Sequence, residues 1–332
     1  MPDFVTEKKI NKILIIRLSS LGDILLTTPV IRALKEKFPG AQVDFTVKNQ
    51  YKDALSANPN LSNFIIYDKK ENGQIAARLA TSRYDLIIDL QNNFRSRKLI
   101  RGLNGEKFRF RKPSLKKFLL VRFKLNLMKD LKTISQRYAE TANVSIDDKG
   151  LELFIPSAIK TKLPKGENYI GFCPGSRHYT KRWPPEYFAK LGNELNLLGF
   201  KIILFGGKDD SELCASLNEL IENSVNLQND DILLQTAADM RECKMIVTND
   251  SGLMHTASAL GIPIVSIFGS TVKEFGFVPQ GTQNLILENK SLSCRPCSHV
   301  GRAECPQKHF KCMNDLTPES VLYQIKNFQR GL

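Results

Sequence analysis

The sequence predicts an α/β protein with two doubly wound domains, each a parallel sheet with helices on both faces. Short apolar runs alternate with helix-like stretches along the chain, which is the pattern of βαβ units. The alternation stops at a polar, lysine-rich stretch near residues 155–166 and then starts again. A length of 332 residues also exceeds what one hydrophobic core usually fills. We therefore expect one domain over residues 1–160 and a second over residues 161–332.

The elements of the first half follow from apolar runs and from helix signals. The first run ends in the turn SSLGD, after which Thr28 and Pro29 provide an N-cap and a first helical position. Apolar residues then recur at helical spacing from Val30 until Pro39 and Gly40 end the helix. Buried parallel strands are expected at residues 12–18, 42–47, 64–67 and 86–90.

The second half has the same organisation, although no sequence repeat is visible. Strands are expected at residues 169–173, 201–205, 245–248 and 264–268, and helices at residues 185–198, 211–221 and 253–260. Open parallel sheets bind ligands beyond the carboxyl ends of their strands. The turns that follow the strands are therefore where we expect functional residues.

Composition excludes several classes of protein. With 42% hydrophobic and 25% charged residues, the chain is not collagen-like, mucin-like or wholly disordered. No apolar run approaches the roughly 20 residues that span a bilayer. The first residues lack the apolar region of a secretory signal, and seven cysteines, an odd number, argue for a reducing compartment. We expect a cytoplasmic protein.

Four of the cysteines lie close together near the C-terminus, at Cys294, Cys297, Cys305 and Cys312. Their spacing leaves two interpretations open. One is a structural zinc site; the other is a set of buried thiols with an occasional disulfide.

The positive charge of the chain is local. Residues 95–132, the basic segment, contain 14 Lys and Arg against two acids, which accounts for +12 of the net charge of +14. Such a segment predicts a polyanionic partner, namely nucleic acid, anionic lipid headgroups or phosphorylated sugars. The alternative is a solvated basic helical face.

Three turns at expected strand ends carry candidate chemistry. In the first, SSLGD, the carboxylate of Asp23 is a candidate general base, or else a helix cap. In the second, Ser176 and Arg177 follow a Gly turn and precede Lys181, an arrangement suited to phosphate. Neither G-x-x-x-x-G-K-[ST] nor G-x-G-x-x-G occurs, so ATPase-type and ordinary dinucleotide sites are not supported.

The third turn pairs a carboxylate with the start of a helix. Asp250 and Ser251 end an expected strand, and the free amides that follow suit an anion. His255 lies on the first helical turn, either facing the same ligand or capping the helix. Two anion-binding turns in one domain and a carboxylate in the other favour transfer from an activated, phosphorylated donor.

Together these motifs resemble the glycosyltransferase family 9 heptosyltransferases, which add heptose to the inner core of lipopolysaccharide. The resemblance covers nearly the whole chain. It rests on SSLGDILLTTPVIRALK, DLQNNFRSR, PGSRHYTKRWPPEYF, LFGG, TNDSGLMHTASALGIPIVSIFG and the tail CRPCSHVGRAECPQKHFKCMNDLTPESV. It implies the GT-B fold, with two Rossmann-like domains facing each other across a cleft. It also implies an acceptor in the N-terminal domain, an ADP-sugar in the C-terminal domain, and inversion with no metal and no other cofactor.

The resemblance also implies roles for individual residues. Asp23 matches the general base. Asp209 or Asp210, after the Gly206-Gly207 turn, matches a ribose contact. The expected donor-binding residues are Ser176, Arg177, Lys181, Asp209, Asp250, Ser251, Gly252 and His255, and the expected acceptor-binding residues are Gly22, Arg95 and Arg97.

The leading hypothesis is a heptosyltransferase at the cytoplasmic face of the inner membrane. Its partners would be a nucleotide-sugar donor, a lipid A-core saccharide and, peripherally, anionic membrane. An enzyme of the same fold acting on another nucleotide sugar, a transferase or an epimerase, is the alternative. A nucleic-acid-binding protein has the basic segment in its favour, but no nucleic-acid motif accompanies the charge.

Overall fold

The structure, a computed structural model, describes residues 9–128 and 132–331. Residues 1–8 of the expected first domain and residues 129–131 of the basic segment lie outside the described residues.

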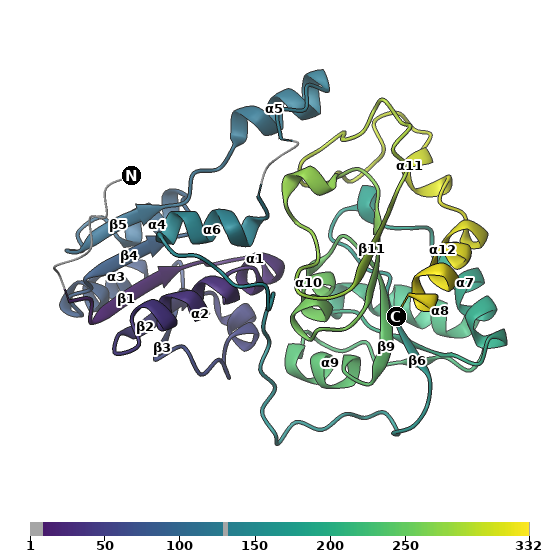
Figure 1. The fold of residues 1–332 in the computed structure, drawn as a ribbon, viewed down its shortest axis with the longest axis horizontal. Helices are drawn as coiled ribbons and strands as arrows, with labels where there is room; N and C mark the ends of the chain where they lie inside the picture. The colour runs from purple at the N-terminus through teal and green to yellow at the C-terminus, as the bar shows by residue number, and fades with distance from the viewer. Residues whose placement is uncertain (1–8, 129–131, 332) are drawn as a thin grey trace. The chain divides into compact units, whose positions relative to one another are not determined.

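The chain divides into two compact units (Figure 1). The first domain comprises Met1–Lys112 and Ile134–Lys149, and the second comprises Pro113–Thr133 and Gly150–Leu332. This division differs from the expected boundary at residue 160, because the segment Pro113–Thr133 belongs to the second domain and the main part of that domain begins at Gly150, eleven residues earlier than expected.

Local contacts explain both differences. Lys124 donates hydrogen bonds to the carbonyl oxygens of Cys294 and Pro296, at 2.9 and 2.7 Å, which ties its segment to the second domain. Gly150 has a φ of +77°, and any side chain there would meet the backbone of Gly281. Only glycine fits this close approach, and it fixes where the second domain starts.

The first domain is a parallel sheet in the order β3-β2-β1-β4-β5 (Figure 1). Side chains of α3 and α4 pack with side chains of this sheet in one apolar cluster. Its strands are β1 (Lys12–Ile16), β2 (Gln42–Val47), β3 (Asn63–Ile66), β4 (Leu86–Asp89) and β5 (Glu106–Arg109). Its helices are α1 (Leu21–Leu25), α2 (Thr28–Lys37), η1 (Asn49–Ala54), α3 (Asn72–Thr81), α4 (Phe94–Leu99) and α6 (Ile134–Ala142). The helix predicted from Thr28 is α2, although its N-cap is Thr27 and Pro29 is therefore one position further in.

The second domain is a parallel sheet in the order β11-β10-β9-β6-β7-β8. Its strands are β6 (Tyr169–Cys173), β7 (Lys201–Leu204), β8 (Val225–Asn226), β9 (Cys243–Asn249), β10 (Ile264–Phe268) and β11 (Asn284–Glu288). Its helices are α5 (Ser114–Phe123), η2 (Tyr179–Lys181), α7 (Pro185–Leu197), η3 (Lys208–Asp210), α8 (Ser211–Leu220), α9 (Leu233–Met240), α10 (Gly252–Ala259), η4 (Lys273–Phe275), α11 (Lys311–Asn314) and α12 (Pro318–Arg330). The expectation of two doubly wound parallel sheets is confirmed.

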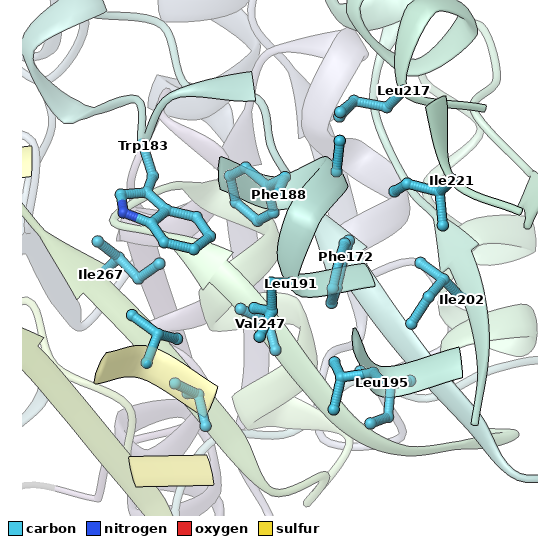
Figure 2. Packing of buried hydrophobic residues seen from close by; sticks show 14 of the residues in the cluster. Phe172, Trp183, Phe188, Leu191, Leu195, Ile202, Leu217, Ile221, Val247 and Ile267 are labelled. Atoms are coloured by element: carbon cyan, nitrogen blue, oxygen red, sulfur yellow. The ribbon is translucent and has the colours of Figure 1, made fainter. Parts of the chain in front are cut away.

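Trp183 anchors the largest apolar cluster of the second domain and holds the loop after β6. Its ring lies edge-on to Phe188, with centroids 4.9 Å apart, and Phe188 packs on Phe172 of β6 at 5.5 Å. Figure 2 shows these rings in the cluster with Leu191 and Val247. Burying an aromatic side chain of this size contributes roughly 1.5–3 kcal/mol. The core thereby fixes the end of the loop after β6, in which Lys181 lies two residues before Trp183.

Candidate functional sites

In each sheet the order of the strands reverses at one point, and the candidate residues lie beside these switch points. In the first sheet, β2 and β3 extend to one side of β1, whereas β4 and β5 extend to the other. In the second sheet, the same reversal occurs between β6 and β9. Ligands of open α/β sheets bind beyond the carboxyl ends of the strands at such a switch point. The Asp23 turn follows β1, and the turns bearing Ser176 and Asp250 follow β6 and β9.

Asp23 is held by two neighbours in the first domain. Its Oδ1 pairs with an Arg17 guanidinium nitrogen at 2.7 Å, and both side chains are largely buried. Its Oδ2 accepts hydrogen bonds from the backbone N–H and the hydroxyl of Ser20, at 3.1 and 2.7 Å. Asp23 therefore does cap α1, as the simpler interpretation expected, and it also carries a charge partner that the motif did not reveal.

The electrostatics of this turn keep Asp23 ionised. Burial alone would raise the pKa of its carboxyl, but the Arg17 charge and the Ser20 hydrogen bonds outweigh burial and lower the pKa below its ordinary value. Tyr138 of α6 completes the group: the Arg17 guanidinium lies 5.6 Å from the centre of its ring. Burial is the main cause that raises the pKa of Tyr138, which therefore stays a neutral hydrogen-bonding phenol.

The turn after β4 supports the Asp23 turn. The side-chain oxygen of Gln91 accepts hydrogen bonds from the backbone N–H groups of Leu18 and Ser19, at 2.8 and 3.2 Å. Asp89 accepts a bond of 2.9 Å from the hydroxyl of Ser96 in α4. These contacts fix α4 relative to β1, and α4 carries two of the expected acceptor contacts.

A basic cavity of about 890 Å³ lies beside α4 in the first domain. It is lined by Asn92, Arg97, Lys107, Phe108, Arg109, Phe110, Arg111, Arg137, Glu140 and Thr141. Five cations against one carboxylate make it a site for an anionic ligand. Among the expected acceptor residues, Arg97 lines this cavity, Arg95 is exposed on α4, and Gly22 is buried in α1.

In the second domain, Asp250 is the centre of the expected donor site. Its Oδ2 pairs with Lys181 Nζ at 2.7 Å and accepts the hydroxyl of Thr271 at 2.7 Å. Its carbonyl oxygen lies 3.5 Å from the hydroxyl of Ser176. Three turns, after β6, β9 and β10, thus meet at one carboxylate. We call Ser176, Lys181, Asp250, Ser251 and the amides that begin α10 the anion cradle.

The helix end in the cradle has an open hydrogen-bonding group. Ser251 is the N-cap of α10, and within residues 9–128 and 132–331 its buried hydroxyl has no hydrogen-bond partner. Gly252 begins the helix, His255 is buried one turn further on, and Arg177 is exposed beside Ser176. A buried hydroxyl and helix-terminal amides beside a lysine form an arrangement that binds phosphate.

Of the two candidate ribose contacts, Asp210 is the one brought to the cradle. Its carboxylate occupies the space that a side chain at Gly175 would need, and it accepts the Gly207 N–H at 3.1 Å. Burial raises the pKa of this carboxyl. Asp209, its neighbour in η3, is exposed.

Arg295 braces the cradle from the C-terminal tail, a role that sequence reasoning missed. Its guanidinium donates to the carbonyl oxygens of Gly269, Asn289 and Thr271, at 2.6, 2.6 and 2.9 Å. It also pairs with the buried Glu288 at 3.0 Å. The loop after β10 is therefore fixed, and Thr271 in that loop holds Asp250. The CxxC position of Arg295 gave no indication of this contact.

The cysteines of the tail are free thiols. Cys294 Sγ lies 3.9 Å from His309 Nε2, and burial raises the pKa of Cys312 to about 12. Across the described residues, no three His, Cys, Asp or Glu side chains are grouped so as to hold a metal ion. Cys312 is buried, whereas Cys294, Cys297 and Cys305 are half-buried.

Comparison with known proteins places these sites in a family. The family model described as glycosyltransferase family 9 (heptosyltransferase) matches residues 73–308. A lipooligosaccharide heptosyltransferase 2 of Campylobacter jejuni is 28% identical over 319 residues, 92% of this chain and 95% of the relative. Among the described helices, none is both long and apolar enough to cross a membrane.

Solved structures share the fold. A family 9 glycosyltransferase from Veillonella parvula superimposes with a TM-score of 0.80 at 23% identity, covering 98% of this chain and 99% of the other. An ADP-heptose lps heptosyltransferase II from E. coli superimposes with a TM-score of 0.76 at 23% identity, covering 97% and 100%. The expected GT-B class is confirmed by these likenesses. From its family match, and from anion-binding turns that agree with it, the chain belongs to glycosyltransferase family 9, the heptosyltransferases.

Proposed function

We propose that this glycosyltransferase moves heptose from ADP-heptose to the inner core of lipopolysaccharide. The observation that carries the proposal is the anion cradle at the switch point of the second sheet. There a lysine and helix-terminal amides converge with the buried Ser251 hydroxyl, which has no hydrogen-bond partner in the described part of the chain. The family match and the heptosyltransferase relatives support heptose as the transferred sugar.

The cradle would bind the diphosphate of the donor. As the bond between the anomeric carbon and the diphosphate breaks, negative charge grows on the departing ADP. Lys181 and the amides of α10 are fixed before the reaction and stabilise that charge. Asp210, at the end of the β7 turn, is the better placed of the two carboxylates for the ribose.

Asp23 would serve as the general base of an inverting displacement. The acceptor hydroxyl oxygen attacks the anomeric carbon, its proton passes to Asp23, and ADP leaves with the electrons of the broken bond. A lowered pKa keeps Asp23 ionised at neutral pH, the form that a base requires. Arg17 and Ser20 hold the carboxylate in one orientation.

The acceptor would be an anionic, lipid-anchored saccharide. The basic cavity, with Arg97 in its lining, suits its phosphate or carboxylate groups, and Gly22 and Arg95 remain proposed contacts. The cationic residues of the basic segment would favour anionic lipid, so the enzyme would work peripherally at the cytoplasmic face of the inner membrane. Because Lys181 and helix amides neutralise the donor, we propose that no metal is needed.

Incubation with ADP-heptose and defined truncated core acceptors tests the proposal. Mass spectrometry should show an acceptor that gains one heptose, with ADP released in equal amount, and EDTA should leave the rate unchanged. Interconversion of the sugar nucleotide without an acceptor would point instead to an epimerase. Strict, reversible dependence on Mg²⁺ would overturn the metal-free mechanism.

A further inference from the structure

The helix α5 and the residues after it present an apolar patch on the surface of the second domain. Fourteen large hydrophobic side chains are exposed among the described residues, and five of them fall within positions 115–127. These five, the apolar patch, are Leu115 (70% exposed), Phe118 (55%), Phe123 (63%), Leu125 (50%) and Leu127 (48%). Such a concentration marks an interaction surface, since isolated exposed apolar residues are ordinary but clusters are not.

The patch is displayed by a segment that is firmly attached to its domain. Leu120 and Met128 are buried against Phe275 in a small cluster of their own. Lys117 Nζ lies over the rings of Phe275 and Phe277, 5.5 and 5.4 Å from their centroids. One face of α5 thus anchors the helix.

A second anchor closes the end of α5. Lys124 Nζ donates to the carbonyl oxygens of Val121, Cys294 and Pro296 at 2.7–2.9 Å. This lysine is the left-handed C-cap of the helix, so the chain after it, with Leu125 and Leu127, leaves from a fixed point. The exposed apolar side chains therefore belong to an ordered surface.

Charge decides what kind of surface this patch fits. Residues 111–127 contain six Lys and Arg and no acid, and Lys116 and Arg122 are exposed between the apolar side chains. Aromatic and aliphatic side chains interleaved with cations suit the headgroup region of an anionic bilayer, where rings enter the acyl boundary and cations meet phosphate. A soluble acidic partner would be matched by the cations but would leave the apolar side chains uncovered.

We infer that the apolar patch inserts into the interface of an anionic membrane, so that the second domain, the expected donor domain, carries a membrane anchor. The inference rests on the proposed function, which places the acceptor in a membrane. It goes beyond charge attraction, because insertion predicts a part of the binding that salt does not remove.

Vesicle partitioning of the full chain separates insertion from charge attraction. The patch variant Leu115→Ser/Phe118→Ser/Phe123→Ser and the control Leu197→Ser/Leu198→Ser/Leu220→Ser lose equally many exposed apolar side chains and no charge. On phosphatidylglycerol–phosphatidylethanolamine vesicles at high salt, the patch variant should partition at least about tenfold more weakly than wild type, and the control should match wild type. Equal partitioning of the patch variant, or complete loss of wild-type binding at high salt, would overturn the inference.

A fluorescence measurement gives a second readout if the triple variant folds poorly. Trp183 is the chain's single tryptophan and is buried, so a Phe123→Trp variant adds one exposed reporter. Brominated lipids should quench that reporter, and they should not quench a Leu197→Trp control. No quenching at position 123 would contradict insertion, as would dimer formation through the patch in gel filtration.

An activity assay separates this inference from the proposed function. Turnover of a delipidated soluble acceptor should be unchanged in the patch variant. Failure of that assay in wild type would count against the proposed function and not against insertion.

Discussion

At the scale of single residues, the proposed mechanism makes the pairing of Arg17 with Asp23 responsible for the acid limb of the pH–rate profile. The guanidinium lowers the pKa of Asp23 against the effect of burial, so the carboxylate form persists to lower pH than for an ordinary aspartate. In Arg17→Met, the pKa of Asp23 should rise. The acid limb of the pH profile of kcat/KM should then move to higher pH, because the base becomes protonated sooner as pH falls.

The control for that experiment is a second Arg–Asp pair in the same domain. Arg32→Met removes the partner of Asp147, whose pKa is also lowered, chiefly by its hydrogen bond with Arg32. The acid limb should stay in place in this variant. Coincident profiles for wild type and Arg17→Met would show that Asp23 does not set the acid limb.

A second single residue, Lys181, contributes the positive charge of the anion cradle through its ammonium group. In Lys181→Ala, donor binding and the chemical step should both weaken, because the lysine neutralises phosphate in the ground state and in the transition state. We expect kcat/KM for ADP-heptose to fall roughly 10- to 1000-fold in steady-state kinetics. The matched control is Lys190→Ala, which removes an exposed lysine paired with Glu319. Unchanged kinetics in Lys181→Ala would remove the lysine from the donor site.

At the scale of elements, the C-terminal tail supports the anion cradle through Arg295, which holds the loop of Thr271. Replacing Arg295 alone would leave the buried Glu288 without its cation, so the informative variant is Arg295→Met/Glu288→Gln. The loop after β10 should loosen and Thr271 should leave Asp250, so KM for ADP-heptose should rise more than kcat falls. Arg295→Lys should restore only part of the affinity, because one ammonium cannot replace the planar guanidinium. An unchanged KM in a folded double variant would contradict this positioning role.

The elements that the sequence predicted well are the buried ones. The runs at 169–173 and 264–268 are β6 and β10 with the same bounds, because a strand covered on both faces is a nearly continuous apolar run. The strand β2, at 42–47, also has the predicted bounds, although buried Asp44 and Thr46 interrupt its apolar residues. The strand β5, Glu106–Arg109, was not predicted. It lies at the edge of its sheet and is half exposed, so its charged sequence lacks the apolar pattern of a buried strand and indicated only a basic segment. The structure divides that segment between the cavity of the first domain and α5 of the second.

The candidate site residues that the sequence predicted are those in the turns that follow strands. Strand ends and glycine-containing motifs led to Asp23, Ser176 and Asp250. Partners that lie far away in the sequence were not predictable, because no local pattern links them. Thr271 lies 21 residues from Asp250 in the sequence. Arg295 contacts the loop of Thr271 from the C-terminal tail, where the sequence pattern indicated only a cluster of cysteines.

At the scale of the whole molecule, the proposed function divides acceptor and donor chemistry between two domains that share one topology. In each domain the candidate turns lie at the switch point, where the strand order of the sheet reverses. The first domain has the Asp23 carboxylate there, and the second has the anion cradle. Residues that serve the acceptor should therefore be separable from residues that serve the donor.

The most direct test of that division uses the variant Asp23→Asn. Calorimetry measures its affinity for ADP, and mass spectrometry of the product measures its turnover, both on the same preparation. The affinity of the variant for ADP should stay within a few-fold of that of wild type, because the proposed role of Asp23 is toward the acceptor. Turnover should fall by roughly 10²–10⁴, the usual contribution of general-base catalysis. Turnover like that of wild type, or a loss of ADP affinity as large as the loss of rate, would contradict that division.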